Sequence, residues 1–567
     1  MKPMKFKQLA VMGGLLAGLF SMSAMQASAA ALPAPEEVFC TGAQPTACVP
    51  LNGGGSSAAT PFMTQVPLNL LDQPVSPSTN FPVHYVNGDI LVPSITAGKL
   101  HVWTGNRGGV PTIIRYSATG SSDGVLRLQN PTTNASSLMH YLDHLAGTCS
   151  SGPTLKTRAA DSKQYYEYTG CNTVVAGDLP ETMGMADVAG SSFHQVGPFP
   201  TAVKPLDQSM LTSTSTAIVP WQFIVGEHVK KDIGIPPAHN LVPVVGFSRL
   251  EIEAILGHTV TDWRQLGLVT DVGTLGTPDA SSPITLCLRS AGSGSKAALD
   301  ETVMKDANEF TVQTVAITSA ADGVIFGTST QDVQDCIRGN AGNGRPAHPR
   351  GIAYVDADVS VATLPAYPVK LNGMYASDIV VFGQSTSNGL PPQPAPNNTL
   401  TTLDDTSTTN SSNDGATNIV RNKFTPGALV GDLVVIIGGT GAGQSFTITG
   451  NTATQLSVAP ANWATVPDAT SAYKVVPDLS DSKQTVRCGQ YYYWAGERMN
   501  VRNYADPGIT ADMTSLNNDF ITSSSSAPTV ALLPAGQFWV AGSDMYTFKN
   551  ADAGPVFWKA GAHPCAQ

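Results

Sequence analysis

The chain has 567 residues, of which 42% are hydrophobic and 13% are charged. Its 54 glycines and 41 prolines make up about a sixth of the sequence, which is below the level at which low complexity or disorder dominates. This composition excludes a disordered chain, a coiled coil and a collagen-like fibre, and the length allows about three or four domains. The sparse charge, with abundant serine, threonine and glycine, is typical of an exported protein rich in strands and turns.

The first residues have the pattern of a secretory signal peptide over 1–29. Three lysines within the first seven residues precede an apolar run at 9–20, and Ala-Ser-Ala at 27–29 forms a small-x-small cleavage site. The apolar run is too short to cross about 30 Å of hydrocarbon, and no later run of about 18 apolar residues occurs. We therefore expect a protein exported to the periplasm or the cell exterior, without a membrane anchor.

Removal of this leader, which holds three lysines and no acid, leaves 28 basic and 42 acidic residues, a net charge of −14. Such a balance disfavours nucleic acid as a partner, because its phosphates are bound by clustered lysines and arginines. One local site can still attract a small anion against an unfavourable net charge.

The chain after the leader holds eight cysteines, at positions 40, 48, 149, 171, 287, 336, 488 and 565. An even number in an oxidising compartment predicts up to about four disulfides. Pairing in sequence order is the simplest expectation, although the sequence leaves the connectivity open. No Cys-x-x-Cys or Cys-x-x-Cys-His occurs, which argues against zinc, thioredoxin-type and haem chemistry, and no cofactor is expected.

Between about 62 and 380, short apolar runs alternate with helical patterns, which predicts an α/β fold. Residues 390–416 are mostly proline, asparagine, serine and threonine, a composition typical of a flexible connector. Residues 417–477 contain strand-like runs bounded by glycine and asparagine turns, which predicts a small all-β module. Within the α/β part, buried strands are expected at 113–116, 218–225, 241–245, 284–288 and 352–355, and helices at 248–256 and 295–307.

The strongest chemical motif is Arg289 to Ser295 (RSAGSGS), which follows an apolar strand and opens a helix. Small residues let the backbone approach a ligand closely, free N–H groups at a helix start favour an anion, and a guanidinium fork suits phosphate or carboxylate oxygens. Ser293 and Ser295 add hydroxyl donors. The structural alternative is an N-capped helix after a glycine-rich turn, with Arg289 solvated, and this segment alone does not decide between the two.

A second motif, 120–124 (GSSDG), also follows a strand and matches the Gly-x-Ser-x-Gly pattern of a nucleophile elbow. A serine hydrolase would need an acid and a histidine beside Ser122, and the ten histidines offer no distinctive partner. The alternative is a second serine-lined turn, in which Ser121 faces the same anion as Arg289.

Three further patterns are weaker. The glycine-rich segment 438–445 lacks the lysine of a phosphate-binding loop and precedes a strand, so a β-turn is expected. His140 and His144 have the spacing of metal ligands on a helix, but no third ligand is near them in sequence, so surface histidines and no metal are expected. The run 183–187 ends in Asp187, which is a cap or turn residue unless the other motifs lie beside it.

In their order along the chain, these motifs resemble those of type II periplasmic binding proteins, specifically the phosphate-binding subunits of phosphate importers. The ligand turns of that family have counterparts at 53–57 (GGGSS), 120–122, 185–187 and 289–295. Two departures are Ala291, which replaces an acid that usually partners the arginine, and Asp123, which stands where a glycine is usual. Outside the ligand turns, the family's other characteristic segments resemble 247–267, 351–355 and 489–494 (GQYYYW), so the connector and β-module form an insertion into a surface loop.

The resemblance implies a two-lobe α/β fold of the periplasmic-binding-protein type II class, with a hinge and a central cleft, plus the small all-β insert. A monomeric binding protein of this kind would work with an ABC importer permease. Asp187 would accept a hydrogen bond from a protonated oxyanion and so favour phosphate over sulfate. The implied boundaries are 30–220, 366–390 and 478–567 for lobe I, 221–365 for lobe II and 391–477 for the linker and insert. Inorganic phosphate or a similar oxyanion would be bound by Ser57, Ser121, Asp187, Arg289, Ser293, Gly294 and Ser295.

Two other classes of function stay open. A secreted scaffold or adhesive protein would use the β-module for attachment, and a secreted esterase or phosphatase would use Ser122. We expect a binding protein rather than an enzyme, because the sequence offers no Asp/His cluster for the metals that phosphate-ester hydrolysis usually requires.

Overall fold

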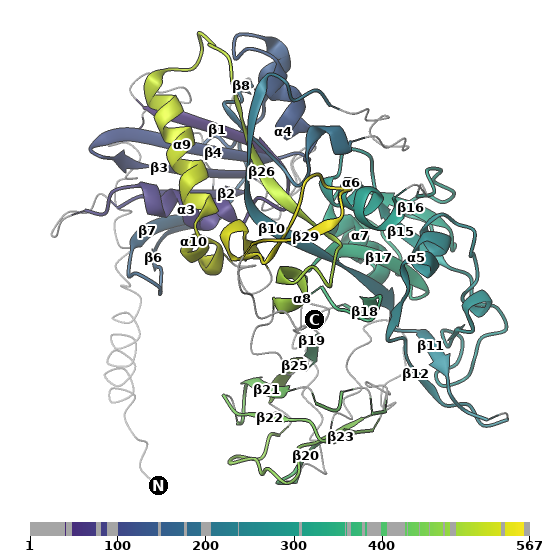
Figure 1. Ribbon diagram of the computed structural model, residues 1–567. Coiled ribbons are helices and arrows are strands. Elements are labelled where there is room, and N and C mark those ends of the chain that lie inside the picture. The colour runs from purple at the N-terminus through teal and green to yellow at the C-terminus, as the bar shows by residue number, and fades with distance from the viewer. Residues whose placement is uncertain are drawn as a thin grey trace, which may run out of the picture. The chain divides into compact units, whose positions relative to one another are not determined.

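The structure of the protein is a computed structural model (Figure 1). The predicted signal peptide, 1–29, and most of the predicted connector, 390–416, lie outside the residues that it describes. None of the described helices is long and apolar enough to cross a membrane. The described residues are 40, 48–74, 81–87, 100–145, 149–174, 178–193, 206–235, 237–305, 309–357, 359, 364–376, 380–382, 399–404, 426–427, 429–431, 433–441, 443–452, 454–468, 471–476, 483–533 and 539–560.

The chain divides into two units, which are described in turn. The lobe boundaries expected from the sequence differ from this division and stay a prediction. Strand β4 (Val110–Ala118) contributes its first half to the smaller unit and its second half to the larger. The smaller unit contains Met1–Pro50, Leu71–Ile114 and Leu142–Ala176, and the larger contains Leu51–Leu70, Arg115–Tyr141 and Gly177–Gln567.

The smaller unit includes four strands in the order β3-β2-β7-β6. Their bounds are Leu100–Arg107, Val83–Asn87, Gln164–Cys171 and Ser151–Thr157. Apolar side chains of β2 and β3, among them Val83, Tyr85 and Val102, form a buried cluster with Cys40 and Cys48. The β-branched and aromatic residues favoured in strands therefore build this core.

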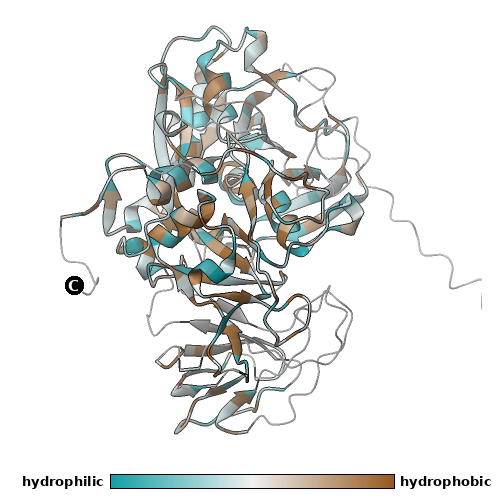
Figure 2. Ribbon diagram, turned by 90° about the vertical axis from the view of Figure 1, so that its right-hand side faces the viewer, coloured by the Kyte–Doolittle hydropathy of each residue, from teal (hydrophilic) through white to brown (hydrophobic). Residues whose placement is uncertain are grey.

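The larger unit is organised around a mixed sheet in the order β16-β15-β17-β10-β26-β9-β1. Figure 2 colours the ribbon by hydropathy, with hydrophobic residues in brown. The predicted α/β class is confirmed, since helices and this large mixed sheet share the unit. The strand bounds in the same order are Val324–Gly327, Thr285–Arg289, Gly351–Asp356, Leu211–Gly226, Trp494–Arg502, Met183–Ala186 and Val49–Gly55.

The long strand β10 joins two groups of strands. Its first part, from Leu211 to Pro220, pairs antiparallel with β26, and its second part, from Trp221 to Val225, pairs antiparallel with β17. Beyond β26 lie β9 and β1, which are parallel to each other. Beyond β17 lie β15 and β16, which are parallel to each other as well. The five strands predicted from apolar runs correspond to β4, β10, β12 (Leu241–Pro243), β15 and β17.

Both predicted helices form, with start signals that the sequence carries. Ser248 caps α5 (Arg249–Leu256) in a capping box with Glu251, an arrangement that satisfies two otherwise free backbone N–H groups. The second helix is α6 (Gly294–Leu299), which begins at its N-cap Ser293 and continues into a π-helical turn at Asp300–Met304.

Further helices pack on the larger unit's sheet and on one another (Figure 1). Helix α7 (Thr330–Arg338) contacts β15, β16 and β17. Helices α3 (Phe62–Leu70), α9 (Ala511–Ser525) and α10 (Ala527–Leu532) contact one another, and α9 also contacts β10.

The predicted all-β module has two small sheets and no helix among its described residues between 399 and 476. Strands β21 (Leu433–Gly438) and β22 (Ser445–Thr447) pair antiparallel, so the glycine-rich segment 438–445 is the predicted turn between strands. The other strands are β19 (Val380–Phe382), β20 (Thr402–Asp404), β23 (Gly450–Asn451), β24 (Gln455–Ser457) and β25 (Ala472–Val476). The module has a core of its own, formed by Leu403, Val434, Ile436, Ile448, Leu456, Val458, Trp463 and Tyr473.

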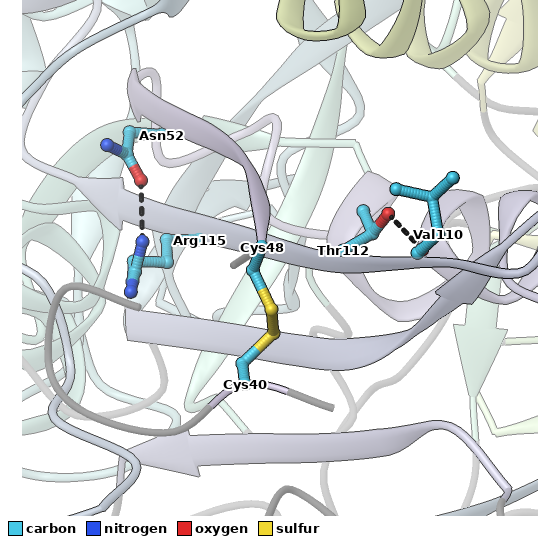
Figure 3. Close-up of a disulfide and its surroundings, with 6 residues drawn as sticks. All are labelled: Cys40, Cys48, Asn52, Val110, Thr112 and Arg115. Atoms are coloured by element: carbon cyan, nitrogen blue, oxygen red, sulfur yellow. Dashed lines mark hydrogen bonds between the residues drawn. A yellow bond between two sulfur atoms is a disulfide. The ribbon is translucent and has the colours of Figure 1, made fainter. Parts of the chain in front are cut away.

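Three disulfides pair in sequence order, as the simplest expectation had it. They are Cys40–Cys48, drawn in Figure 3, Cys149–Cys171, and Cys287–Cys336, which ties β15 to α7. Cys488 is also disulfide-bonded, and Cys565 lies outside the described residues. Disulfides of this density are expected of a protein that folds in an oxidising compartment.

Candidate functional site

The predicted ligand turns end strands of the larger unit and meet one another. Gly120 N donates to the carbonyl oxygen of Gly55 at 2.8 Å, and Ser122 N donates to that of Gly292 at 3.2 Å. Asp187 directly follows β9. In open α/β sheets, ligands bind outside the carboxyl ends of the strands, and these turns have that position.

Gly294 brings three of the predicted site residues together. A Cβ at this position would overlap the carboxylate of Asp187 and would lie 2.5 Å from Ser121 Oγ. Only glycine therefore allows the start of α6 to approach the other two turns so closely. Ser121 and Asp187 are buried, with exposed fractions of 2% and 5%.

Arg289 is a buried cation, with an exposed fraction of 6%. Its Nη1 donates to Thr330 Oγ1 at 2.8 Å and to Ser295 Oγ at 3.4 Å, and its Nη2 donates to the carbonyl oxygen of Thr328 at 3.4 Å. Its Nε has no hydrogen-bond partner, and no carboxylate pairs with the guanidinium, among the residues that the structure describes. Because an unpaired buried charge is costly, this position is suited to an anion.

The two predicted serines of α6 lie beside this guanidinium. Ser293 Oγ and Ser295 Oγ are 2.8 Å apart, and Ser293 Oγ also accepts from Lys296 N at 3.4 Å as the N-cap of the helix. The hydroxyl of Tyr493 on the other side donates to the carbonyl oxygen of Ser295 at 3.0 Å. The segment therefore presents two hydroxyl groups and one guanidinium in one buried place.

Lys296, the other cation of this segment, is compensated inside the protein. It is 1% exposed and forms ion pairs with Glu309 and, at 3.6 Å, with Asp300. Burial alone would lower the pKa of Lys296, but the two carboxylates raise it above its ordinary value. Burial raises the pKa of Glu309 to about 7, with Lys296 acting in the opposite direction. The charge of Lys296 is thus neutralised by acids and does not add to an anion site.

In the first turn, the serine that contacts Asp187 is Ser56. Ser56 Oγ donates to Asp187 Oδ1, and it accepts from Ala58 N at 3.0 Å. The predicted Ser57 is the neighbouring residue. It is half-buried, and its carbonyl oxygen accepts from Thr60 N at 3.3 Å. Its contact with a ligand stays a prediction.

Sequence reasoning missed Ser56, Thr330 and Glu497. The sequence shows two adjacent serines, Ser56 and Ser57, at the end of a strand. Successive side chains of a strand point to opposite faces, so only one of the two hydroxyls faces Asp187, and the sequence does not show which. Thr330 begins a helix far along the chain, and Glu497 lies within a strand of mostly buried residues. Neither belongs to a motif, so only the fold brings them to the site.

The structure does not support a serine nucleophile at Ser122 or a metal site at His140 and His144. Ser122 has helical backbone angles (φ −63°, ψ −34°) and is the N-cap of α4 (Asp123–Leu126). Its hydroxyl contacts no histidine among the described residues. His140 follows strand β5 (Leu138–Met139) instead of lying on a helix, and its Nδ1 pairs with Asp178 at 2.5 Å. The described residues contain no group of three or more His, Cys, Asp or Glu that could hold a metal ion.

No protein-family model and no curated protein matches the chain. Among solved structures, PstS from Borrelia burgdorferi is 12% identical, with a TM-score of 0.30, and the match covers 87% of this chain and 98% of that one. A structure with bound phosphate from Clostridium perfringens, described as a phosphate ABC transporter substrate-binding protein, is 14% identical, with a TM-score of 0.27 and coverages of 58% and 78%. An ABC-type phosphate transport receptor from Vibrio cholerae is 10% identical, with a TM-score of 0.25 and coverages of 57% and 77%.

Proposed function

We propose that the protein is an exported solute-binding protein that captures inorganic phosphate, or a closely related oxyanion, at the site around Arg289. The observation that carries this proposal is the buried guanidinium of Arg289 without a carboxylate partner among the described residues. A bound anion would supply the missing charge, and the planar guanidinium suits two oxygens of one ligand.

The surrounding hydroxyl groups fit an oxyanion with several acceptor oxygens. Ser121, Ser293 and Ser295 are buried and lie on the turns that meet at Gly294. Each hydroxyl has one proton to donate. Ser293 and Ser295 share one hydrogen bond with each other, so one of these two protons, the Ser121 hydroxyl and Arg289 would be the donors to a tetrahedral ligand. No covalent step is needed, and the site as proposed binds without catalysis.

Asp187 gives the proposed site its selectivity. A carboxylate accepts hydrogen bonds and donates none, and Ser56 already occupies Oδ1. Phosphate near neutral pH carries a proton that it can donate to the other oxygen, whereas sulfate carries none. A buried carboxylate that faces sulfate would meet a like charge without a hydrogen bond, which is strongly unfavourable. The site is therefore expected to prefer phosphate through the exclusion of sulfate.

The fold offers a natural arrangement for ligand capture. The groups of strands on either side of β10 would be the two lobes, with β10 and β26 as the connection about which they close. The periplasm or the cell exterior is the proposed location, in keeping with the disulfides. An ABC importer permease is the proposed partner.

Calorimetric titration of the mature protein, freed of bound anion by unfolding and refolding, tests this function. Phosphate should bind with a micromolar or lower dissociation constant, about −8 kcal/mol or better, and sulfate should give no response. The absence of heat with both anions would overturn the proposal and direct attention to the β-module.

A further inference from the structure

A second carboxyl group lies directly behind Asp187. In the pairing of β26 with β9, Arg498 is opposite Ala186 and Met499 is opposite Met185. Continued by one residue, this antiparallel register sets Glu497 opposite Asp187. Side chains of directly opposite residues point to the same face of a sheet. The two carboxyl groups are thus neighbours.

The Glu497 side chain is sealed from solvent and receives no donor. Its exposed fraction is 0%, and neither carboxyl oxygen accepts a hydrogen bond from an N–H or O–H group of the described residues. An ionised carboxylate in this position would be buried without compensation, next to a second carboxylate, which is heavily penalised. A protonated Glu497 instead has a donor, and the Asp187 carboxylate beside it is an acceptor within hydrogen-bonding reach.

The charged and titratable groups around Glu497 agree with a protonated acid. Burial, and next the charge of Asp187, raise the pKa of Glu497 well above its ordinary value; Asp356 adds to this and Arg498 opposes it. Tyr116 on β4 is also close, since Glu497 contributes to the raised pKa of that hydroxyl after burial. Asp187 and Asp356 therefore favour the protonated form of Glu497, and the Tyr116 hydroxyl carries no charge. Only Arg498 favours the ionised form.

We propose that Glu497 is a positioning residue that donates a hydrogen bond to the Asp187 carboxylate and thereby keeps Asp187 in its ionised, acceptor-only form. This inference rests on the proposed function of the site. The pair holds one proton between two carboxyl groups, as a dyad does. The selectivity for a protonated oxyanion would then depend on a residue that does not itself touch the ligand.

The role of Glu497 follows from what would happen to the buried Asp187 carboxylate if Glu497 were absent. Without Glu497, the Asp187 carboxylate would be buried beside a bound anion with one hydrogen bond fewer, which is unfavourable for a charged group. A carboxyl group that carries a proton is a donor, and a donor can bind sulfate as well as phosphate. Ser56 supports the carboxylate from one side, and Glu497 supports it from the strand behind.

The test is the ratio of phosphate to sulfate affinity, measured by calorimetry from about pH 5 to about pH 9 for the wild type and two variants. Glu497→Leu should lower this ratio by about tenfold or more, with the largest loss at acid pH, because a hydrogen bond to a charged group is removed. Glu497→Gln keeps a donor that does not ionise. It should retain the wild-type ratio and should lose less phosphate affinity at alkaline pH than the wild type.

Glu181→Gln is the matched control. Glu181 is likewise 0% exposed with a pKa raised by burial, but its charged neighbours are Asp123, Arg127 and Arg502 rather than Asp187. This variant should leave the anion ratio unchanged. If Glu497→Leu does not fold, the alkaline profile of Glu497→Gln decides the question.

The outcomes separate this inference from the function on which it rests. A wild type that binds neither anion would overturn both. A wild type that prefers phosphate, with an unchanged ratio in Glu497→Leu or an unchanged alkaline profile in Glu497→Gln, would overturn the role of Glu497 alone.

Discussion

Two buried cations lie close together in the sequence, on either side of the turn that opens α6, and their surroundings differ. Lys296 is paired with two carboxylates, Glu309 and Asp300. Arg289 contacts only hydroxyl and carbonyl oxygens of the described residues. Burial of an unpaired charge is costly for both groups. The protein compensates Lys296 with its own acids, and Arg289 has no such compensation among the described residues. The difference separates a cation that stabilises the fold from one that can bind a ligand.

The comparison predicts that removal of Lys296 has the largest effect on stability. Lys296→Met leaves two buried carboxylates without their cation, so the free energy of unfolding should fall by about 3–5 kcal/mol. Urea denaturation of the ligand-free protein measures this free energy of unfolding. Lys156→Met is the control, because Lys156 is 46% exposed and its pair with Glu167 is a surface pair, typically worth about 0–1 kcal/mol. A Lys296→Met variant as stable as the control would contradict the assignment.

The opposite pattern is expected at Arg289. Arg289→Met should reduce phosphate affinity by about 2–5 kcal/mol, which is roughly 30-fold to several thousand-fold. The stability of the ligand-free protein should stay close to that of the wild type, because no described carboxylate loses its partner. Calorimetry and urea denaturation of the same preparation measure the two quantities. Arg264→Met, at an exposed arginine that pairs with Asp262, is the control for affinity. Equal phosphate binding in both variants would remove Arg289 from the site.

The smallest expected effect is a change of anion selectivity on substitution of Asp187, the acid of the proposed anion site. Asp187→Asn replaces one acceptor oxygen by a donor, so sulfate should become a ligand and the phosphate-to-sulfate ratio should fall by about tenfold or more. Phosphate affinity itself should change less. Competition of the two anions for the variant protein measures the ratio, with Asp207→Asn, at an exposed carboxylate, as the control. An unchanged phosphate-to-sulfate ratio would show that Asp187 does not accept a hydrogen bond from the protonated oxygen of the ligand.

The sequence was sufficient to predict those strands, helices and turns whose formation depends mainly on residues that are neighbours in the chain. The apolar runs at 218–225 and 284–288 form β10 and β15, because a continuous run of buried side chains fits a strand covered on both faces. The helix expected at 248–256 and the β-turn expected at 438–445 both form. His140 is exposed, as expected of a surface histidine, whereas His144 was wrongly expected at the surface and is only 4% exposed; the spacing of two histidines does not show which of them the fold will cover.

The candidate site was predicted in part. Its motifs identified Ser121, Asp187, Arg289 and the serines of α6. The structure places Ser121 and Asp187 against Gly294, and Arg289 contacts Ser295, which pairs with Ser293; their contact with a ligand stays a prediction. Ser56 stands in contact with Asp187 beside the predicted Ser57, because a shift of one residue at a strand end reverses the direction of a side chain. Glu497 could not be found in this way, since an acid inside a strand has no local pattern.

The sequence by itself determined the α/β class, the strand-rich character of 417–477 and the turns that hold the polar residues, because periodicity and turn residues act over a few neighbouring positions. Only the tertiary structure decided which charges are compensated. Lys296 meets Glu309, which lies beyond the end of its helix, and Glu497 lies beside Asp187, which belongs to a segment far away in the sequence. Whether a buried charge is free for a ligand depends on these contacts, since electrostatic energies in a protein depend on distance and burial rather than on order along the chain.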